Sequence, residues 1–274
     1  MKRLFIFCAL AITLNACALK SAESTDTSTS TTAEAVPTTS TLSTIGTSTT
    51  PVDLIMYGDS IGREIYSLVA SRVRNQSGGE TLSRVFSGSS PCQWIDTAEE
   101  DAARYQPKNV VILFVGNLFA ECMNGAKGDP QRMAGMRKTV RDSGTIAAMF
   151  PESKIYFVGF ARLIIDELQL DAGMEISAAD YRNMQLRELA DSKMNYHYID
   201  GADLLYDNNA YADYLPCKWF DKDHCSMGVV RVRATDGVHL CPNSTLDYLE
   251  GNLPCPTHNS GAIRLARQVL KELS

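Results

Sequence analysis

Three side chains in this 274-residue chain have types and spacing that suit nucleophilic catalysis. A serine hydroxyl attacks a carbonyl carbon effectively only when a base removes its proton, and the imidazole of histidine is such a base near neutral pH. Asp236 lies three positions before His239, so its carboxylate can orient the ring and stabilise the imidazolium that forms. We therefore predict that Ser60 is the nucleophile, His239 the base and Asp236 the residue that orients the base.

The hydrophobic pattern around Ser60 predicts a strand, a tight turn and a helix. Residues 53–57 form a short apolar run that ends at Gly58, and apolar residues then recur at helical spacing over 61–73. A nucleophile at such a turn is exposed and lies beside the positive end of the helix dipole. Ser60 therefore stands at a position suited to the chemistry predicted for it.

Two further predicted strands end in residues that a hydrolytic site could use. Residues 82–86 predict a strand that runs into a cluster of turn-forming residues containing Gly88. Residues 109–115 form a continuous apolar run, which is typical of a strand covered on both faces, and Gly116-Asn117 comes at its end. We expect this strand at the centre of the sheet.

The remaining pattern alternates strands with helices. Helices are expected near 131–150 and 178–191, strands at 154–159 and 196–200, and a last helix at a cap formed by Asn259 or Ser260. This order predicts a doubly wound α/β fold, a three-layer α/β/α flavodoxin-like sandwich with a parallel sheet of about five strands. In such sheets the site lies beyond the carboxyl ends of the strands.

Four sequence blocks resemble those of the SGNH, or GDSL, hydrolase superfamily. In chain order they are Gly58-Asp59-Ser60, Gly88, Asn117 and Asp236-Gly237-Val238-His239. The resemblance extends from about residue 53 to the C-terminus and includes the order of the elements. It implies an oxyanion hole made of the backbone N–H groups of Ser60 and Gly88 and the side-chain amide of Asn117. It also implies that no metal or organic cofactor is needed. Taken singly, each block is better explained by a turn or a helix cap, whereas four turns that present these groups in this order are much less probable.

The third block departs from the usual Gly-x-Asn-Asp of that superfamily. Val115 stands in place of the first Gly, and Leu118 in place of the Asp. The Gly-Asn form, with Cys122 shortly after it and Cys241 just after the last block, looks like exported bacterial SGNH domains, including those fused to membrane O-acyltransferases. Asn117 still falls at the strand end, so the role that the resemblance implies for it is unchanged.

The residues and the resemblance together predict a serine esterase that cleaves O-acyl esters, with O-acetyl favoured, through an acyl-enzyme on Ser60. The expected substrate is an acylated glycan at a cell surface or in the environment, or another small ester. An O-acyltransferase that moves the acyl group to a sugar hydroxyl would use the same triad and is the alternative. A non-catalytic surface binding module is a further alternative, although a binder has no use for an activated nucleophile.

The N-terminus predicts export. Lys2 and Arg3 precede an apolar run that is too short to span a bilayer, as expected of a signal peptide over residues 1–16. Leu14-Asn15-Ala16-Cys17 resembles a bacterial lipobox, which makes Cys17 the predicted lipidation site. An ordinary cleavable signal with an incidental Cys17 is the alternative.

The composition then divides the chain further. Residues 17–52 are expected to form the lipidated cysteine and a disordered stalk rich in Ser and Thr, because so few of them could be buried. Residues 53–274 form the SGNH hydrolase-like domain that the resemblance implies. We expect an exported bacterial protein, lipid-anchored to a membrane and facing the periplasm or the cell exterior.

Six cysteines follow the predicted lipidation site, and an even number in an exported protein favours disulfides. They are Cys92, Cys122, Cys217, Cys225, Cys241 and Cys255. Proximity along the chain favours pairing them in that order, although six cysteines permit about 15 pairings. A Cys92–Cys122 bond would brace the loops that follow Gly88 and Asn117. The alternative is a zinc site from Cys217, His224, Cys225 and Cys241, whose spacing matches no standard zinc motif.

Charge and composition limit the partners. The chain has 32 Asp and Glu against 26 Lys and Arg, a net charge of −6. It has no run of basic residues to neutralise a phosphate backbone, so no nucleic-acid partner is expected, and membrane contact is expected through the lipid anchor only. We expect a monomer. The aromatic residues near Trp94 and Trp219 either line the substrate cleft or lie in the core.

Overall fold

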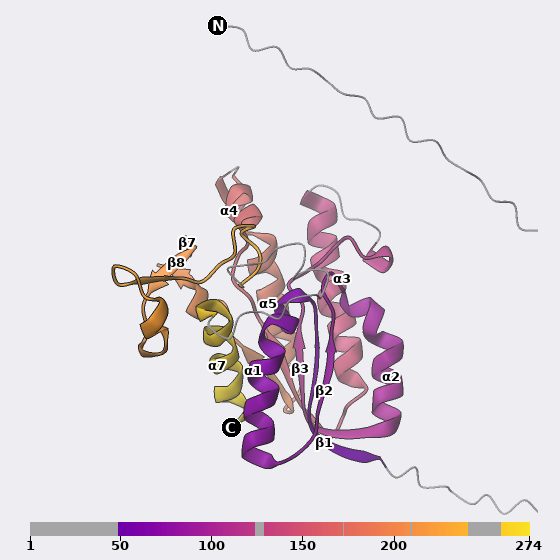
Figure 1. Ribbon diagram of the computed structural model, residues 1–274. Coiled ribbons are helices and arrows are strands. Elements are labelled where there is room, and N and C mark those ends of the chain that lie inside the picture. Colours follow the sequence, from indigo (N-terminus) through magenta and orange to yellow (C-terminus); the bar gives the residue numbers. More distant parts are fainter. Residues whose placement is uncertain (1–48, 124–128, 172, 209, 241–258) are drawn as a thin grey trace, which may run out of the picture. The chain divides into compact units, whose positions relative to one another are not determined.

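A parallel five-stranded sheet with the strand order β2-β1-β3-β4-β5 forms the centre of the fold (Figure 1). The computed structural model describes residues 49–123, 129–171, 173–208, 210–240 and 259–274. The strands are β1 (Thr50–Gly58), β2 (Thr81–Val85), β3 (Tyr105–Leu113), β4 (Lys154–Val158) and β5 (Tyr196–Ile199). This is the flavodoxin-like order, and β3 lies at the centre as predicted. The predicted three-layer α/β/α fold class is confirmed.

Helices cover both faces of this sheet (Figure 1). They are α1 (Ser60–Ser77), α2 (Ile95–Arg104), α3 (Asp129–Ala148), α5 (Ala178–Ala190) and α7 (Ser260–Leu273). A further helix, α4 (Ile164–Asp171), lies beyond the carboxyl ends of the strands (Figure 1). On one face, α1 and α7 pack through residues such as Ile65 and Leu265. On the other face, α2, α3 and α5 contribute Ala98, Val140 and Leu186 to a second cluster.

The sequence of β1 explains its place in the interior of the sheet. Its residues from Val52 to Gly58 are buried without alternation, because both faces of the strand are covered by helices. Burying each of the large apolar side chains contributes about 1.5–3 kcal/mol relative to exposure. The strand begins at Thr50, before the predicted start at residue 53, and pairs there with Tyr105 of β3.

Helices α1 and α7 both begin at polar caps. The Asp59 carboxylate accepts a hydrogen bond from the N–H of Ile61, which caps α1. At α7 the cap is Asn259, one of the two residues predicted for this role, and its side chain accepts from the N–H of Ala262. Such caps satisfy N–H groups that have no partner within the helix and contribute about 1 kcal/mol each.

Several elements are absent from the sequence-based prediction. Helix α2 spans only ten residues, rich in Asp, Glu and Ala, and Ala98 is the apolar side chain that it buries completely, so few large apolar residues mark its inner face. Helix α4 was also not predicted. Two small antiparallel pairs join β6 (Tyr206–Asp207) to β7 (Ala210–Tyr211) and β8 (Tyr214–Pro216) to β9 (Val229–Arg231). Strands of two or three residues are too short to produce a recognisable alternation.

The predicted signal peptide, the lipidation site Cys17 and most of the stalk lie outside the described residues. Within the part of the chain that the structure describes, no helix combines the length and the apolar character needed to cross a membrane.

Replacing Gly58 with alanine should destabilise the protein. The added methyl group would lie 2.8 Å from the carbonyl oxygen of Leu113 and 3.1 Å from the Cα of Gly62, and neither backbone atom can move without disturbing β3 or α1. We expect the free energy of unfolding in urea to fall by about 1–3 kcal/mol. Gly144→Ala in α3 is the matched control, because its methyl group would meet only the flexible tip of Leu189. The control should be neutral or stabilising, and equal losses in both variants would contradict this account.

Candidate active site

Ser60, His239 and Asp236 come together at the carboxyl end of the sheet. The Nε2 atom of His239 lies 2.9 Å from the Oγ of Ser60, although 179 positions separate the two residues. The Nδ1 atom of His239 lies 2.6 Å from Oδ2 of Asp236. Ser60 opens α1 directly after β1, whereas Asp236 and His239 belong to the segment that precedes α7. The fold therefore assembles the three predicted residues in the order serine, imidazole, carboxylate.

The Asp236 carboxylate also shapes the turn that carries His239. Its Oδ1 atom accepts hydrogen bonds from the backbone N–H of Val238 at 2.9 Å and of His239 at 3.0 Å. Gly237 adopts a φ of 69°, in the left-handed region that favours glycine. One oxygen of Asp236 thus fixes the backbone, which leaves the other in place to hold the ring.

The charges around the ring favour its protonated form. Burial lowers the pKa of His239, but the hydrogen bond to Asp236 and the negative charge of Glu64 raise it, and the net pKa lies above the ordinary value of 6.5. For Asp236, burial raises the pKa, but the hydrogen bonds from His239 and Val238 outweigh it and hold the pKa well below its usual range. Asp236 therefore stays ionised and can stabilise an imidazolium.

Asp59 does more than form a turn. Its buried carboxylate accepts from the N–H of Ile61 at 3.0 Å and from the N–H of Val115 at 2.7 Å. These bonds tie the turn that carries Ser60 to the segment that follows β3. Burial raises the pKa of Asp59 to about 6, against the lowering effect of these two hydrogen bonds and of the nearby Arg182.

Glu64 holds the His239 segment onto α1. It lies one helical turn after Ser60, is buried, and accepts a hydrogen bond from the backbone N–H of Leu240 at 2.8 Å. Within the same segment, Arg233 donates to the carbonyl of Val238 at 3.4 Å. Glu64 was not predicted as a site residue. The available signal is a carboxylate within the apolar stripe of α1, beside Ile61 and Ile65.

Arg182 fixes the other side of the site. This buried arginine of α5 donates to the carbonyl of Val115, and also to the carbonyl of Phe160 at 3.0 Å. Burial lowers its pKa, and the negative charges of Asp166 and Asp59 act in the opposite direction. Asp59 and Arg182 together occupy both backbone groups of Val115, two residues before Asn117. Arg182 was likewise not predicted.

The structure brings Gly88 and Asn117 next to each other. The side-chain amide of Asn117 donates to the carbonyl of Gly88, and its oxygen accepts from the N–H of Phe119 at 3.1 Å. A primary amide has two N–H groups, so one remains to bind a further acceptor. The Ser89 hydroxyl lies 3.1 Å from the carbonyl of Gly58, which joins the Gly88 loop to the end of β1.

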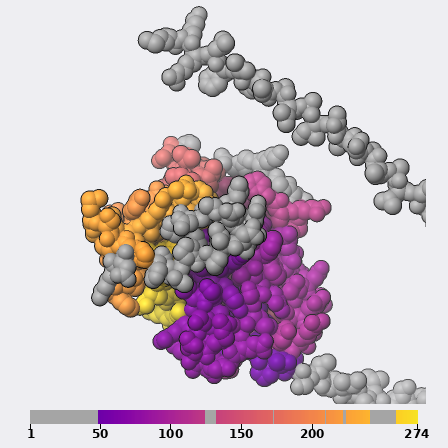
Figure 2. Space-filling model, viewed as in Figure 1, coloured from indigo at the N-terminus to yellow at the C-terminus, as the bar shows by residue number. Residues whose placement is uncertain are grey.

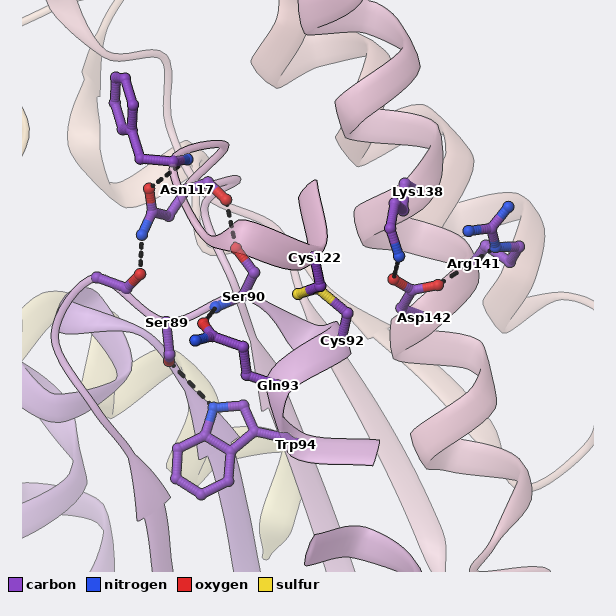
Figure 3. The surroundings of a disulfide bond; sticks show 12 residues. Ser89, Ser90, Cys92, Gln93, Trp94, Asn117, Cys122, Lys138, Arg141 and Asp142 are labelled. Carbon is purple, nitrogen blue, oxygen red and sulfur yellow. Dashed lines mark hydrogen bonds and ion pairs between the residues drawn. A yellow bond between two sulfur atoms is a disulfide. The ribbon is translucent and has the colours of Figure 1, made fainter. Parts of the chain in front are cut away.

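A disulfide joins the loops that follow Gly88 and Asn117 (Figure 3). Cys92, in a 3-10 helix over Pro91–Trp94, is bonded to Cys122, in another over Glu121–Met123. The Ser90 hydroxyl donates to the backbone carbonyl of Asn117 beside this bond. The two loops are therefore braced as predicted from the positions of these cysteines along the chain.

The second predicted disulfide, between Cys217 and Cys225, is also present. Their sulfur atoms are bonded to each other, so the alternative zinc site lacks two of its four ligands. The third predicted pair, Cys241 and Cys255, lies outside the described residues. Across the residues that the structure describes, no group of three or more His, Cys, Asp or Glu side chains is arranged to hold a metal ion.

Trp94 and Trp219 lie in different environments. The indole N–H of Trp94 donates to the Ser89 hydroxyl at 3.0 Å. The indole ring packs edge-on against the ring of Tyr57, with 6.2 Å between the two ring centroids. Trp94 therefore supports the Gly88 loop from within the fold (Figure 3). Trp219 is 69% exposed and lies on a different part of the surface, beside α7.

No protein-family model matches the chain, and no curated protein matches it. Several solved structures are similar to it. A lipase/acylhydrolase from Enterococcus faecalis is 14% identical, with a TM-score of 0.49 over 81% of this chain and 95% of that chain. A GDSL-like lipase from Bacteroides thetaiotaomicron is 16% identical, with a TM-score of 0.46 over 81% and 89%. A family 3 carbohydrate esterase from Clostridium thermocellum is 13% identical, with a TM-score of 0.42 over 81% and 94%.

Replacing Glu64 with glutamine should lower the pKa of His239. The variant keeps an oxygen that can accept from Leu240 but loses the negative charge that favours the imidazolium. Titration of the His239 ring by NMR measures the change. Glu80→Gln, at an exposed position before β2, is the control and should leave the pKa of His239 unchanged. An unchanged or raised pKa in Glu64→Gln would contradict the proposed electrostatic role.

Removing the Cys92–Cys122 bond should destabilise the protein. In the chain-entropy account a disulfide restricts the unfolded chain, more strongly for a longer loop, and typically contributes about 2–4 kcal/mol. The double variant Cys92→Ala/Cys122→Ala should therefore lose that much free energy of unfolding. The sequence separation is 30 for this bond and 8 for Cys217–Cys225. Cys217→Ala/Cys225→Ala should accordingly lose less, and the reverse order in urea denaturation would contradict the entropic account.

Proposed function

We propose that this protein is a serine esterase that hydrolyses O-acyl esters. The observation that carries the proposal is the 2.9 Å contact between Nε2 of His239 and Oγ of Ser60, with Asp236 on the opposite ring nitrogen. A base within hydrogen-bond reach of a hydroxyl, itself oriented by a third group, is the arrangement that activates a serine. The similarity of the sequence blocks to the SGNH superfamily points to the same chemistry.

In the first half of the reaction, Ser60 forms a covalent acyl-enzyme. Its Oγ attacks the ester carbonyl carbon while its proton passes to Nε2 of His239, and the carbonyl electron pair moves onto oxygen. The N–H groups of Ser60 and Gly88 and the second amide N–H of Asn117 stabilise this oxyanion. Each such donor typically contributes about 3 kcal/mol to the transition state. The oxyanion then collapses, and His239 gives its proton to the leaving alcohol.

In the second half, water replaces the alcohol. His239, neutral again, removes a proton from water, which attacks the acyl carbon and releases the acid and free Ser60. Asp236 stabilises the imidazolium in both halves without taking up the proton. All of these steps use side chains and backbone groups of the chain itself.

The proposed substrate is an O-acylated glycan, with O-acetyl as the favoured acyl group. The proposed location is a bacterial membrane surface, reached through the signal peptide over residues 1–16 and held by a lipid on Cys17, with the residues between Cys17 and the start of β1 at Thr50 as the stalk. The N-terminal sequence pattern supports this location. Disulfides also favour an oxidising compartment outside the cytoplasm.

Ser60→Ala should abolish hydrolysis of p-nitrophenyl acetate, because no other group takes over as nucleophile. We expect the rate of hydrolysis to fall at least about 1,000-fold. Ser67→Ala, at an exposed position on the same helix, is the matched control and should retain full activity. A fluorophosphonate probe should label the peptide that contains Ser60, and acetate should be released from an O-acetylated xylan. Retained turnover by Ser60→Ala, or labelling of another serine, would overturn the proposal.

A further inference from the structure

A cleft of about 770 Å³ lies on the face formed by α1 and α7, away from Ser60. Its walls are the last turns of both helices and a 3-10 helix over Trp219–His224. Arg72, which lines it, lies three turns further along α1 than Ser60, about 18 Å away at the rise of an α-helix. In Figure 2 the indigo, yellow and orange surfaces of these segments adjoin on one face. The cleft is thus separate from the candidate active site.

The charged side chains that line this cleft are all cationic, in a chain whose net charge is −6. Four of them are exposed, namely Arg72, Lys218, Arg267 and Lys271. Among the residues that the structure describes, none of these four forms an ion pair with a carboxylate. Unneutralised cations gathered in a concave surface produce a positive potential that attracts anions.

An exposed aromatic face stands beside these cations. Trp219 is 69% exposed, and the guanidinium of Arg267 lies 5.0 Å from its ring centroid and 5.2 Å from that of Phe220. The cation–π contact orients the guanidinium and is worth about 0.5–1 kcal/mol at an exposed site. The indole offers a flat apolar surface on which the C–H face of a ligand ring can pack.

The wall beneath these side chains is rigid. Arg264, buried at the base, donates to Asp221 at 3.0 Å and to the carbonyl of Pro216 at 2.7 Å. The Cys217–Cys225 disulfide closes the loop that carries Trp219. A site whose wall is already ordered loses little conformational entropy when a ligand binds.

We propose that this cleft binds an acidic saccharide, such as an oligomer of uronic acid residues. Carboxylates of the ligand pair with the four cations, and one sugar ring packs on Trp219. A neutral sugar would leave the cations unpaired, and a simple anion would leave the indole unused. The volume falls in the range of ligand-binding clefts. In combination with the proposed esterase, such a site would hold an acidic glycan on the protein while Ser60 acts on its esters.

Binding is measured on the full chain carrying Ser60→Ala, so that no ester hydrolysis interferes. Isothermal titration with tetragalacturonate should give binding that weakens as salt is raised, whereas maltotetraose, a neutral tetrasaccharide, should bind at least 10-fold more weakly. Arg267→Ala and Trp219→Ala should each weaken tetragalacturonate binding at least 10-fold. Arg104→Ala, an exposed arginine of α2 on the opposite face of the sheet, is the matched control and should bind normally.

Three results would overturn the proposal: no binding of tetragalacturonate, binding equal to that of maltotetraose, or binding unaffected by Arg267→Ala and Trp219→Ala. Binding to phosphatidylglycerol vesicles but not to tetragalacturonate would identify the cleft as a contact for an anionic membrane instead, and would also overturn it. Hydrolysis of p-nitrophenyl acetate by Arg267→Ala with an intact Ser60 should equal that of the unmodified chain. Failure of the saccharide site is therefore distinguishable from failure of the proposed esterase.

Discussion

The contact between Ser60 and His239 depends on two buried carboxylates that lie on either side of the serine. A carboxylate removed from water is costly unless hydrogen bonds replace its hydration. Asp59 finds its donors at Ile61 and Val115, and Glu64 at the N–H of Leu240. These donors are in place only when the end of β3 and the segment before α7 are both correctly folded. The burial of two charges thus links the formation of the site to the formation of the fold.

Two buried arginines add hydrogen bonds of the opposite kind, because they donate to backbone carbonyl groups whereas the carboxylates accept from backbone N–H groups. Arg182 donates to the carbonyl of Val115, whose N–H donates to Asp59, and Arg233 donates to the carbonyl of Val238, whose N–H donates to Asp236. Burial lowers the pKa of both arginines. The segments that carry Asn117 and His239 are therefore each held by side chains through an N–H and a C=O group. Such a network holds reacting groups in a fixed geometry, which is what electrostatic stabilisation of a transition state requires.

Helices α1 and α7 contribute to both the candidate active site and the cationic cleft. Ser60 opens α1, and Gly261 in the first turn of α7 lies against Leu240, the residue after His239, so the starts of both helices lie near the candidate active site. The last turns of the same helices line the cationic cleft. The apolar contact between them, through residues such as Val69 and Leu265, keeps the two surfaces in a constant relation. A ligand held in the cleft would thus have a defined position relative to Ser60.

The main strands and helices, the three residues proposed as a triad and two of the disulfide pairs could all be predicted from the amino-acid sequence, because each leaves a local signal. Apolar runs, helical spacing, turn residues and close cysteines can all be read over a few positions. Helices α2 and α4 were missed, because they are short and bury few large apolar side chains. The roles of Glu64 and Arg182 around the site, and the place of Trp219 in a separate cleft, became visible only in the folded chain. A buried charge is stabilised by donors or acceptors from distant segments, and no local pattern records which segments those are.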